Sequence, residues 1–165
     1  MRPVLLGLLV AVLAIGVDQA TKWWILLDVM HPPRVIEVTP FFNVVLVWNR
    51  GISFGMFSNE SMAGVWILSL LALIIVGFLT NWLRKAESKR AAISLGLIIG
   101  GALGNVIDRA VHTAVLDFLD FYLGSFRWPA FNAADSFITV GAILLILDSL
   151  FPTGGNQSKL NKPDS

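Results

Sequence analysis

Four long apolar runs constrain the fold of this chain more than any other feature of its sequence. They cover about residues 4–27, 62–83, 91–110 and 133–151, and about 20 helical residues are enough to cross the roughly 30 Å hydrocarbon core of a bilayer. Only 14% of the residues are charged, against about 25% in an average soluble domain. The sequence therefore predicts an all-α membrane protein, a bundle of four transmembrane helices in a phospholipid bilayer.

The rest of the composition excludes several classes of function. A net charge of +1 provides no basic surface, so no nucleic-acid partner is expected. The absence of cysteine excludes disulfides, a thiol nucleophile and cysteine-based metal sites. Two histidines without an HExxH motif are too few for a zinc hydrolase, and the chain has no GxSxG elbow. We expect neither a metal nor a cofactor.

The placement of lysine and arginine predicts the orientation of the bundle. The basic residues of three segments fall on the same side of a four-span topology: Arg2; Arg84, Lys85, Lys89 and Arg90; Lys159 and Lys162. By the positive-inside rule both termini are then cytoplasmic, and residues 28–61 and 111–132 face outward. A cleaved signal peptide in place of the first span is disfavoured, because such peptides have apolar stretches of only about 7–15 residues.

The first outward segment, at about 34–57, has the composition of β-strands. Its "RVIEVTPFFNVVLVW", residues 34–48, is rich in β-branched and aromatic residues and is interrupted by Pro40, which predicts two short strands. We therefore expect a small extracytoplasmic β-sheet, with residues 111–131 forming a loop beside it. Residues 1–152 are expected to form a single integral-membrane domain and residues 153–165 a polar cytoplasmic tail.

A polar stripe follows one face of the third apolar run. Asn105, Asp108, Arg109 and His112 are spaced i, i+3, i+4 and i+7, which puts all four on the same side of a helix. An ionisable group at the bilayer centre costs about 2.5–3.5 kcal/mol on insertion scales, so the stripe must face protein or a wet cavity. A structural seam between helices is its first interpretation, and a functional site is the alternative.

Small residues precede this stripe. Gly96, Gly100 and Gly104 recur at every fourth position, with Gly101 beside them. Glycines at this spacing allow a second helix to approach closely. They predict tight packing that would fix the side chains beyond them.

Asp18 and Lys22 interrupt the first apolar run. They lie four residues apart, so they can form an ion pair along one helix face. A self-neutralised pair is the first interpretation, since charges inside membranes usually find partners. The alternative is that Lys22 meets a lipid headgroup or substrate while Asp18 orients it.

Three further carboxylates are expected at the outer interface. Asp117 and Asp120 follow the third run, and Asp135 opens the fourth. Asp135 can also be read as a charge at a helix N-terminus, and Asp120 as a solvated loop charge. Two aspartates brought together away from bulk water cannot both ionise readily, which provides the acid–base pair that activates water against an amide. The residues alone leave an aspartyl hydrolase, a transport role and a structural role open.

Five motifs, in this order along the chain, resemble the lipoprotein signal peptidase (signal peptidase II) family. They are "DQATK" at 18–22, "NRGISFG" at 49–55, "GGALGNVIDR" at 100–109, "VLDF" at 115–118 and "FNAADS" at 131–136. The resemblance implies a metal-independent aspartic endopeptidase of the bacterial inner membrane. Such enzymes remove the signal peptide from diacylglyceryl-modified prolipoproteins, cutting before the lipid-modified cysteine, and globomycin-type inhibitors block them.

The resemblance also implies which residues form the site. The catalytic pair falls on Asp117 and Asp135, and Asp120 matches no catalytic position. The supporting and substrate-binding positions fall on Asp18, Lys22, Asn49, Gly101, Asn105, Asp108, Arg109 and Asn132.

On this basis we expect Asp135 to act as the base for water and Asp117 as the proton donor. Arg109 is expected to neutralise Asp108 and brace Asn105. Asn49 and Asn132 are expected to donate to the substrate backbone, with the sheet at 35–48 and the loop at 111–131 clamping an extended signal peptide. Two alternatives from other classes are a small proton- or ion-conducting protein and a non-catalytic assembly subunit.

Overall fold

The computed structural model describes residues 1–51 and 62–151 of the chain. Its four long helices are α1 (Pro3–Trp24), α2 (Met62–Arg84), α3 (Lys89–His112) and α4 (Ala133–Leu150), and a π-helical turn at Ile25–Val29 continues α1. Each is long and apolar enough to cross a membrane. The four predicted spans are therefore confirmed. The end of the predicted β segment, residues 52–57, and the tail 153–165 lie outside the described residues.

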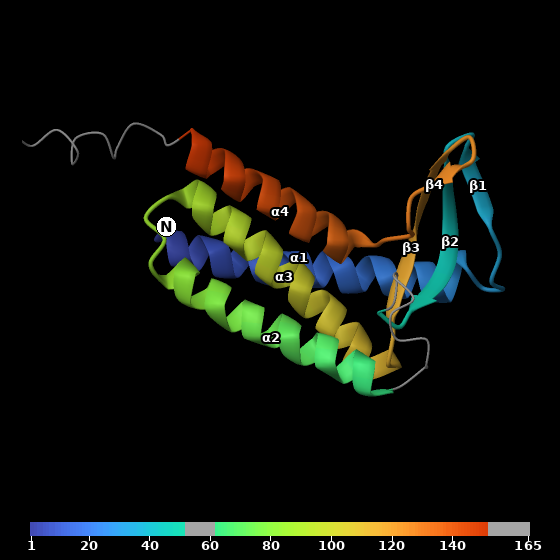
Figure 1. The fold of residues 1–165 in the computed structure, drawn as a ribbon, viewed down its shortest axis with the longest axis horizontal. Coiled ribbons are helices and arrows are strands. Elements are labelled where there is room, and N and C mark those ends of the chain that lie inside the picture. The colour runs from blue at the N-terminus through green and yellow to red at the C-terminus, as the bar shows by residue number, and fades with distance from the viewer. Residues whose placement is uncertain (52–61, 152–165) are drawn as a thin grey trace, which may run out of the picture.

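Helix α3 forms the centre of the bundle, with α1, α2 and α4 around it (Figure 1). In its most apolar stretch 56% of the residues are buried, against 22% or less in the other three spans. The core between α1, α2 and α3 contains the buried side chains of Ala11, Leu79, Leu83, Ala92, Leu95 and Ile99. The outer faces of the other helices remain apolar and exposed, as expected for surfaces that contact lipid.

Glycines on α3 set how closely the helices approach, as the sequence predicts. A Cβ atom at Gly100 would lie 2.6 Å from the carbonyl oxygen of Ala11 and 2.7 Å from the Cβ of Ala14, both on α1. Gly101 faces the other way, where a Cβ would clash with the backbone of Ala134 on α4. α3 is therefore packed backbone-to-backbone against two helices at once.

A four-stranded antiparallel sheet lies at one end of the bundle, in the order β1-β2-β3-β4 (Figure 1). The strands are β1 (Ile36–Thr39), β2 (Phe42–Asn49), β3 (Val115–Leu123) and β4 (Phe126–Arg127). The two strands expected at 34–48 are confirmed. The loop expected at 111–131 is wrong, because Val115–Leu123 forms β3, which pairs with β2, and Phe126–Arg127 forms β4, which pairs with β3. Its pairing partner is about seventy positions away, and local sequence cannot supply that information.

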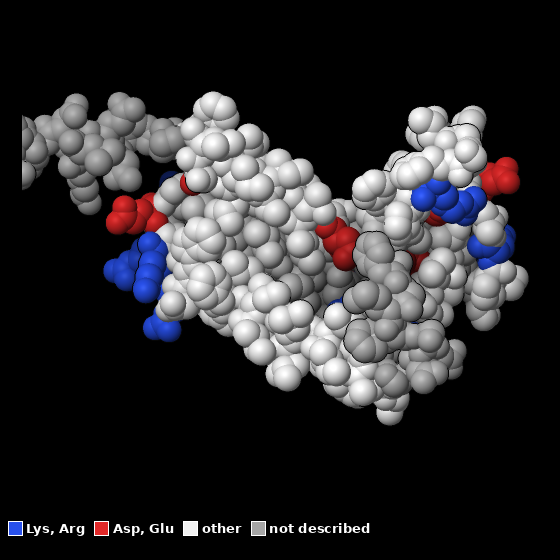
Figure 2. All heavy atoms as spheres, viewed as in Figure 1, with Lys and Arg blue, Asp and Glu red and all other residues white. Residues whose placement is uncertain are grey.

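The opposite end of the bundle carries the basic residues of the N-terminus and of the link between α2 and α3 that were predicted to face the cytoplasm, while Lys159 and Lys162 lie outside the described residues. The N-terminus, the link from α2 to α3 and the end of α4 all lie there, away from the sheet (Figure 1). Figure 2 shows lysine and arginine side chains gathered at this end. The link between α2 and α3 contributes Arg84, Lys85, Lys89 and Arg90.

The glycine contact leads to a stability prediction. We expect Gly100→Ala to destabilise the bundle by about 1–3 kcal/mol, because the added methyl group overpacks the α1–α3 contact. The matched control is Gly77→Ala on α2, where a Cβ has no atom within 4 Å. The measurement is the thermal unfolding midpoint in detergent, and equal midpoints for the two variants would show that the α1–α3 approach does not limit stability.

Candidate active site

Asp117 enters the site from the first half of β3. Helix α3 ends at His112, and Thr113 adopts a left-handed conformation with φ of 56°, which turns the chain away from the helix axis. The Leu116 N–H then donates to Asp108 Oδ2 at 3.1 Å, tying the start of the strand back to α3. Asp117 follows, with only 2% of its surface exposed.

Asp135 enters from the first turn of α4. Asn132 caps this helix: its side-chain oxygen accepts from the Asp135 N–H at 3.0 Å, and Asp135 Oδ2 accepts from the Asn132 N–H at 3.2 Å. This reciprocal arrangement satisfies amide groups that a helix start otherwise leaves unpaired. The helix dipole also favours the negative charge of Asp135. The expected position of Asp135 at a helix N-terminus is confirmed.

Asn132 joins the two carboxyl groups. Besides capping Asp135, its Nδ2 donates to Asp117 Oδ1 at 2.7 Å. Asn49, at the end of β2, donates from its Nδ2 to Asp117 Oδ2 at 2.9 Å. Both amides donate to Asp117, because a buried carboxylate needs hydrogen-bond partners. Their expected donation to the substrate backbone stays a prediction.

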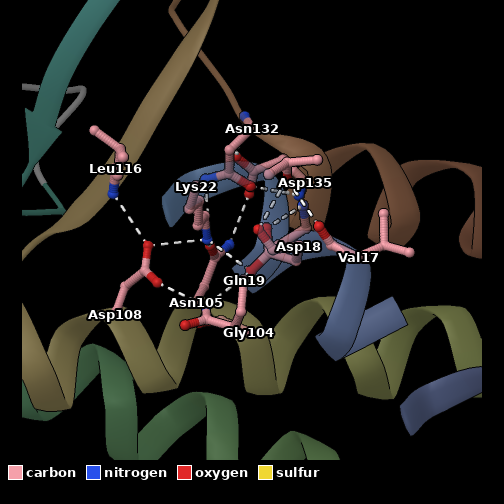
Figure 3. Close-up of polar contacts among 12 residues, drawn as sticks. Val17, Asp18, Gln19, Lys22, Gly104, Asn105, Asp108, Leu116, Asn132 and Asp135 are labelled. Atoms are coloured by element: carbon pink, nitrogen blue, oxygen red, sulfur yellow. Dashed lines mark hydrogen bonds and ion pairs between the residues drawn. The ribbon is translucent and has the colours of Figure 1, made fainter. Parts of the chain in front are cut away.

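Asn105 on α3 links this pair to a buried charge cluster. Its Nδ2 donates to Asp135 Oδ1 at 2.9 Å, and its Oδ1 accepts from Asn132 Nδ2 at 3.2 Å and from Lys22 Nζ at 3.1 Å. One amide side chain therefore contacts α1, α4 and the residue that caps α4. Figure 3 shows Asn105 between Lys22 and the start of α4.

Lys22 lies between two aspartates in the interior. Its Nζ is 2.9 Å from Asp18 Oδ2 and 2.9 Å from Asp108 Oδ2, and its side chain is only 4% exposed. The predicted Asp18–Lys22 pair is therefore confirmed, while the alternative of Lys22 at a lipid headgroup is wrong, because Lys22 is enclosed by protein. Asp18 Oδ1 accepts from the Ala134 N–H at 2.9 Å, which anchors α4 to α1.

Gln19 is a member of this cluster that our reading of the sequence missed. Its Nε2 donates to Asp18 Oδ2 at 3.1 Å, to Asp108 Oδ1 at 2.9 Å and to the Gly104 carbonyl at 3.3 Å (Figure 3). The sequence signal that could have indicated this role is the position of Gln19 next to Asp18 in the motif "DQATK". It bridges two carboxylates that would otherwise have only Lys22 in common.

The contacts of Arg109 agree only in part with the predicted ones. Its guanidinium donates to the Asn105 backbone oxygen at 3.4 Å, so the expected bracing of Asn105 is present. The ion pair of Asp108, however, is formed with Lys22. Arg109 interacts electrostatically with Asp135, Asp108 and Asp117 together. Among the described residues its Nε is one of two buried side-chain atoms without a hydrogen-bond partner.

Asp120 is a buried residue of a strand, so the expectation that it is a solvated loop charge is wrong. It lies on β3, in the centre of the sheet, and is 2% exposed. Arg127 on β4 donates to its Oδ2 at 2.8 Å, and Asn43 on β2 donates to the same oxygen at 3.2 Å. Asp120 therefore ties three strands together. None of these contacts involves Asp117 or Asp135.

The surroundings of Asp117 favour its protonated form. The pKa of Asp117 is raised from 3.8 to about 6, chiefly by burial and further by the negative charge of Asp135. The hydrogen bonds from Asn49 and Asn132 act in the opposite direction because they favour the carboxylate. Two coupled carboxyl groups in different environments form an arrangement suited to acid–base catalysis.

The structure thus brings nearly all of the expected site residues into one network. Gly101 is the exception, since it allows α4 to pack on α3 and carries no polar group. Among the described residues, no group of three or more histidine, aspartate or glutamate side chains is arranged to hold a metal ion.

Comparison with known proteins identifies the family. Residues 10–151 match the model of Signal peptidase (SPase) II. The chain is 44% identical over 149 residues to the lipoprotein signal peptidase of Methylorubrum extorquens, covering 88% of this chain and 86% of the relative. It is 47% identical over 142 residues to that of Aeromonas hydrophila, covering 84% of each.

Solved structures agree with this assignment. A bacterial membrane enzyme structure obtained by the in meso method at 2.3 Å superimposes with a TM-score of 0.75 at 30% identity, covering 96% of this chain and 94% of the other. A second, at 1.9 Å, gives 0.74 at 33% identity, covering 89% and 94%. Family model, relatives and fold coincide over most of the length, and the chain belongs to the lipoprotein signal peptidase (signal peptidase II) family.

Proposed function

We propose that this protein is an aspartic endopeptidase that uses Asp117 and Asp135 as its catalytic pair. The observation that carries the proposal is the double contact of Asn132, whose side chain donates to Asp117 while its backbone N–H donates to Asp135. A single residue thereby fixes two carboxyl groups that are 18 positions apart in sequence (135 minus 117). Catalysis by such a pair requires both groups to reach a common water molecule.

The two aspartates have different roles in this mechanism. Asp135 accepts hydrogen bonds from Asn105 and the Asn132 N–H at a helix N-terminus, and these favour its carboxylate. It takes a proton from water as the water oxygen attacks the scissile carbonyl carbon. The pKa of Asp117 is raised to about 6, chiefly by burial, and this increases the fraction of enzyme in which Asp117 is protonated. In that form Asp117 gives its proton to the carbonyl oxygen.

The resulting tetrahedral diol then collapses. Asp117 takes back a proton from one hydroxyl, the C–N bond breaks, and the proton held by Asp135 passes to the leaving amine. Both carboxyl groups return to their starting states, and the overall reaction consumes one water. The pair titrates as a unit, so these roles describe one microstate of a coupled system.

The substrate follows from the family. We propose that the enzyme removes signal peptides from prolipoproteins that carry a diacylglyceryl cysteine, that it cuts directly before this cysteine, and that globomycin-type inhibitors block it. The pair lies where the sheet meets the end of the bundle, on β3 and at the start of α4. An extended peptide can bind at this polar site while its lipid chains remain in the bilayer. The basic residues at the other end support an inner-membrane orientation with cytoplasmic termini and an extracytoplasmic active site.

Conservative replacement of either aspartate tests the catalytic pair. We expect Asp117→Asn and Asp135→Asn each to reduce kcat by about a thousandfold or more, because neither variant can transfer the required proton. The measurement is cleavage of a purified precursor in detergent. The precursor with its diacylglyceryl group should be cut and the unmodified form should not.

Asp120→Asn is the matched control, since Asp120 lies on the same strand and is equally buried. It should retain cleavage while losing part of its stability. Full activity in either Asp117→Asn or Asp135→Asn would refute the pair.

The environment of Asp117 predicts how kcat/KM depends on pH. Its carboxyl group must be protonated for the step above, and its pKa is about 6. We expect kcat/KM to fall on the alkaline side of this value, approaching about tenfold for each pH unit. A pH–rate profile of the purified enzyme measures it. A kcat/KM that rises between pH 6 and pH 8 would contradict the assignment of Asp117 as the proton donor.

Chelation tests metal independence. We expect EDTA and 1,10-phenanthroline to leave cleavage unchanged, since the two aspartates supply both proton-transfer steps. A parallel assay with a zinc endopeptidase confirms that the chelators are effective. Loss of cleavage that is restored by adding a divalent cation would show that the aspartates act through a metal.

A further inference from the structure

His112 is the one member of the polar stripe on α3 that the catalytic network does not include. It occupies the last turn of α3, where the ends of α1, α3 and β2 meet. Its ring lies between two tryptophans. The centroid of Trp23 on α1 is 5.6 Å away at an interplanar angle of 61°, and that of Trp48 on β2 is 5.0 Å away at 51°. Edge-to-face and tilted arrangements of this kind are favourable for aromatic rings.

Trp48 directly precedes the residue that binds Asp117. Successive side chains of a strand point to opposite faces, so Trp48 contacts His112 on one face of β2 while Asn49 is directed to the other. There Asn49 Nδ2 donates to Asp117 Oδ2 at 2.9 Å. Because the two residues are consecutive in β2, a change in the orientation of Trp48 changes the direction in which the Asn49 side chain points.

The backbone ladder restrains this end of β2 over a short distance only. The pairing of β2 with β3 shifts register between Val44 and Val47, and only the pairs Val47–Asp117, Trp48–Leu116 and Asn49–Val115 follow the irregularity. β2 ends at Asn49. The Asn49 Oδ1 also accepts from the Gly51 N–H at 2.8 Å, within the same segment of chain. A side-chain contact from outside the sheet adds a restraint that ties this end of β2 to the helices.

We propose that His112 is a positioning residue for the cleavage reaction: by packing between Trp23 and Trp48 it holds the end of β2 so that the Asn49 amide stays hydrogen-bonded to Asp117. This inference rests on the proposed role of Asp117. His112 does not touch the reacting atoms in this scheme and acts only through Trp48 and Asn49.

The hydrogen bond that His112 maintains has a measurable electrostatic effect. The Asn49 amide lowers the pKa of Asp117, opposing the effect of burial. When the amide moves away, the pKa of Asp117 rises, and the alkaline limb of the pH–rate profile moves to higher pH. A residue that merely stabilises the fold would lower the amount of active enzyme without moving this limb.

The test compares three replacements of His112 in the full-length enzyme. His112→Ala and His112→Leu both remove the aromatic ring, and His112→Leu keeps most of the volume, so that a result is obtained even if the alanine variant does not fold. We expect both to lower kcat/KM about ten- to a hundredfold and to move the alkaline limb upward by about 0.5 pH unit. His112→Phe, which keeps a ring between the tryptophans, should restore both values to near those of the wild type.

A double variant tests the route of the effect. If His112 acts through Asn49, His112→Leu combined with Asn49→Ala should have the same alkaline limb as Asn49→Ala alone, because the two changes are not independent. Trp82→Ala is the control for loss of an aromatic ring, since Trp82 lies on α2 and is 45% exposed. The alkaline limb of the pH–rate profile of Trp82→Ala should stay at its wild-type position.

The outcomes separate this inference from the proposed function. A wild-type alkaline limb in His112→Leu, or a further shift in the double variant, overturns the inference and leaves the catalytic pair intact. Cleavage by Asp117→Asn would overturn the proposed function itself.

Discussion

The burial of Lys22 between Asp18 and Asp108 is the interaction on which the rest of the structure depends. One ammonium group is within 2.9 Å of both carboxylates, on two different helices. Taking such charges out of water costs several kcal/mol for each ion unless the remaining hydrogen bonds are satisfied. Gln19, Asn105 and backbone N–H groups complete this shell. The cluster thereby fixes α1, α3, β3 and α4 relative to one another.

The glycines of α3 determine both how the helices pack and how the site is arranged. Gly104 lies directly against Asp18, so any side chain at this position would displace the carboxylate. Gly100 and Gly101 bring α1 and α4 onto opposite sides of α3. The amide of Asn105 can then reach both Lys22 and Asp135. A polar network at this depth is tolerated because nearly every member is paired, which also makes it rigid.

The sheet completes a site that the helices begin. β3 carries Asp117 to the network, and the end of β2 brings Asn49 to it. Asp120 lies on the same strand as Asp117 and accepts hydrogen bonds from Asn43 on β2 and Arg127 on β4, the two neighbours of that strand. The buried Asp120 therefore supports the sheet through its ion pair, whereas Asp117 accepts hydrogen bonds from the neutral amides of Asn49 and Asn132.

Hydropathy by itself determined the four spans, because bilayer thickness sets helix length and every backbone group in lipid must be bonded internally. The positions of lysine and arginine in the links between the spans determined the end at which basic residues gather. Helical spacing also placed Asn105, Asp108 and Arg109 on one face, and the motif resemblance named most of the network. Only the tertiary structure decided that 115–123 is a strand, that Lys22 pairs with Asp108, and that Asp120 is buried. These facts depend on contacts between residues far apart in the chain, which local pattern does not encode.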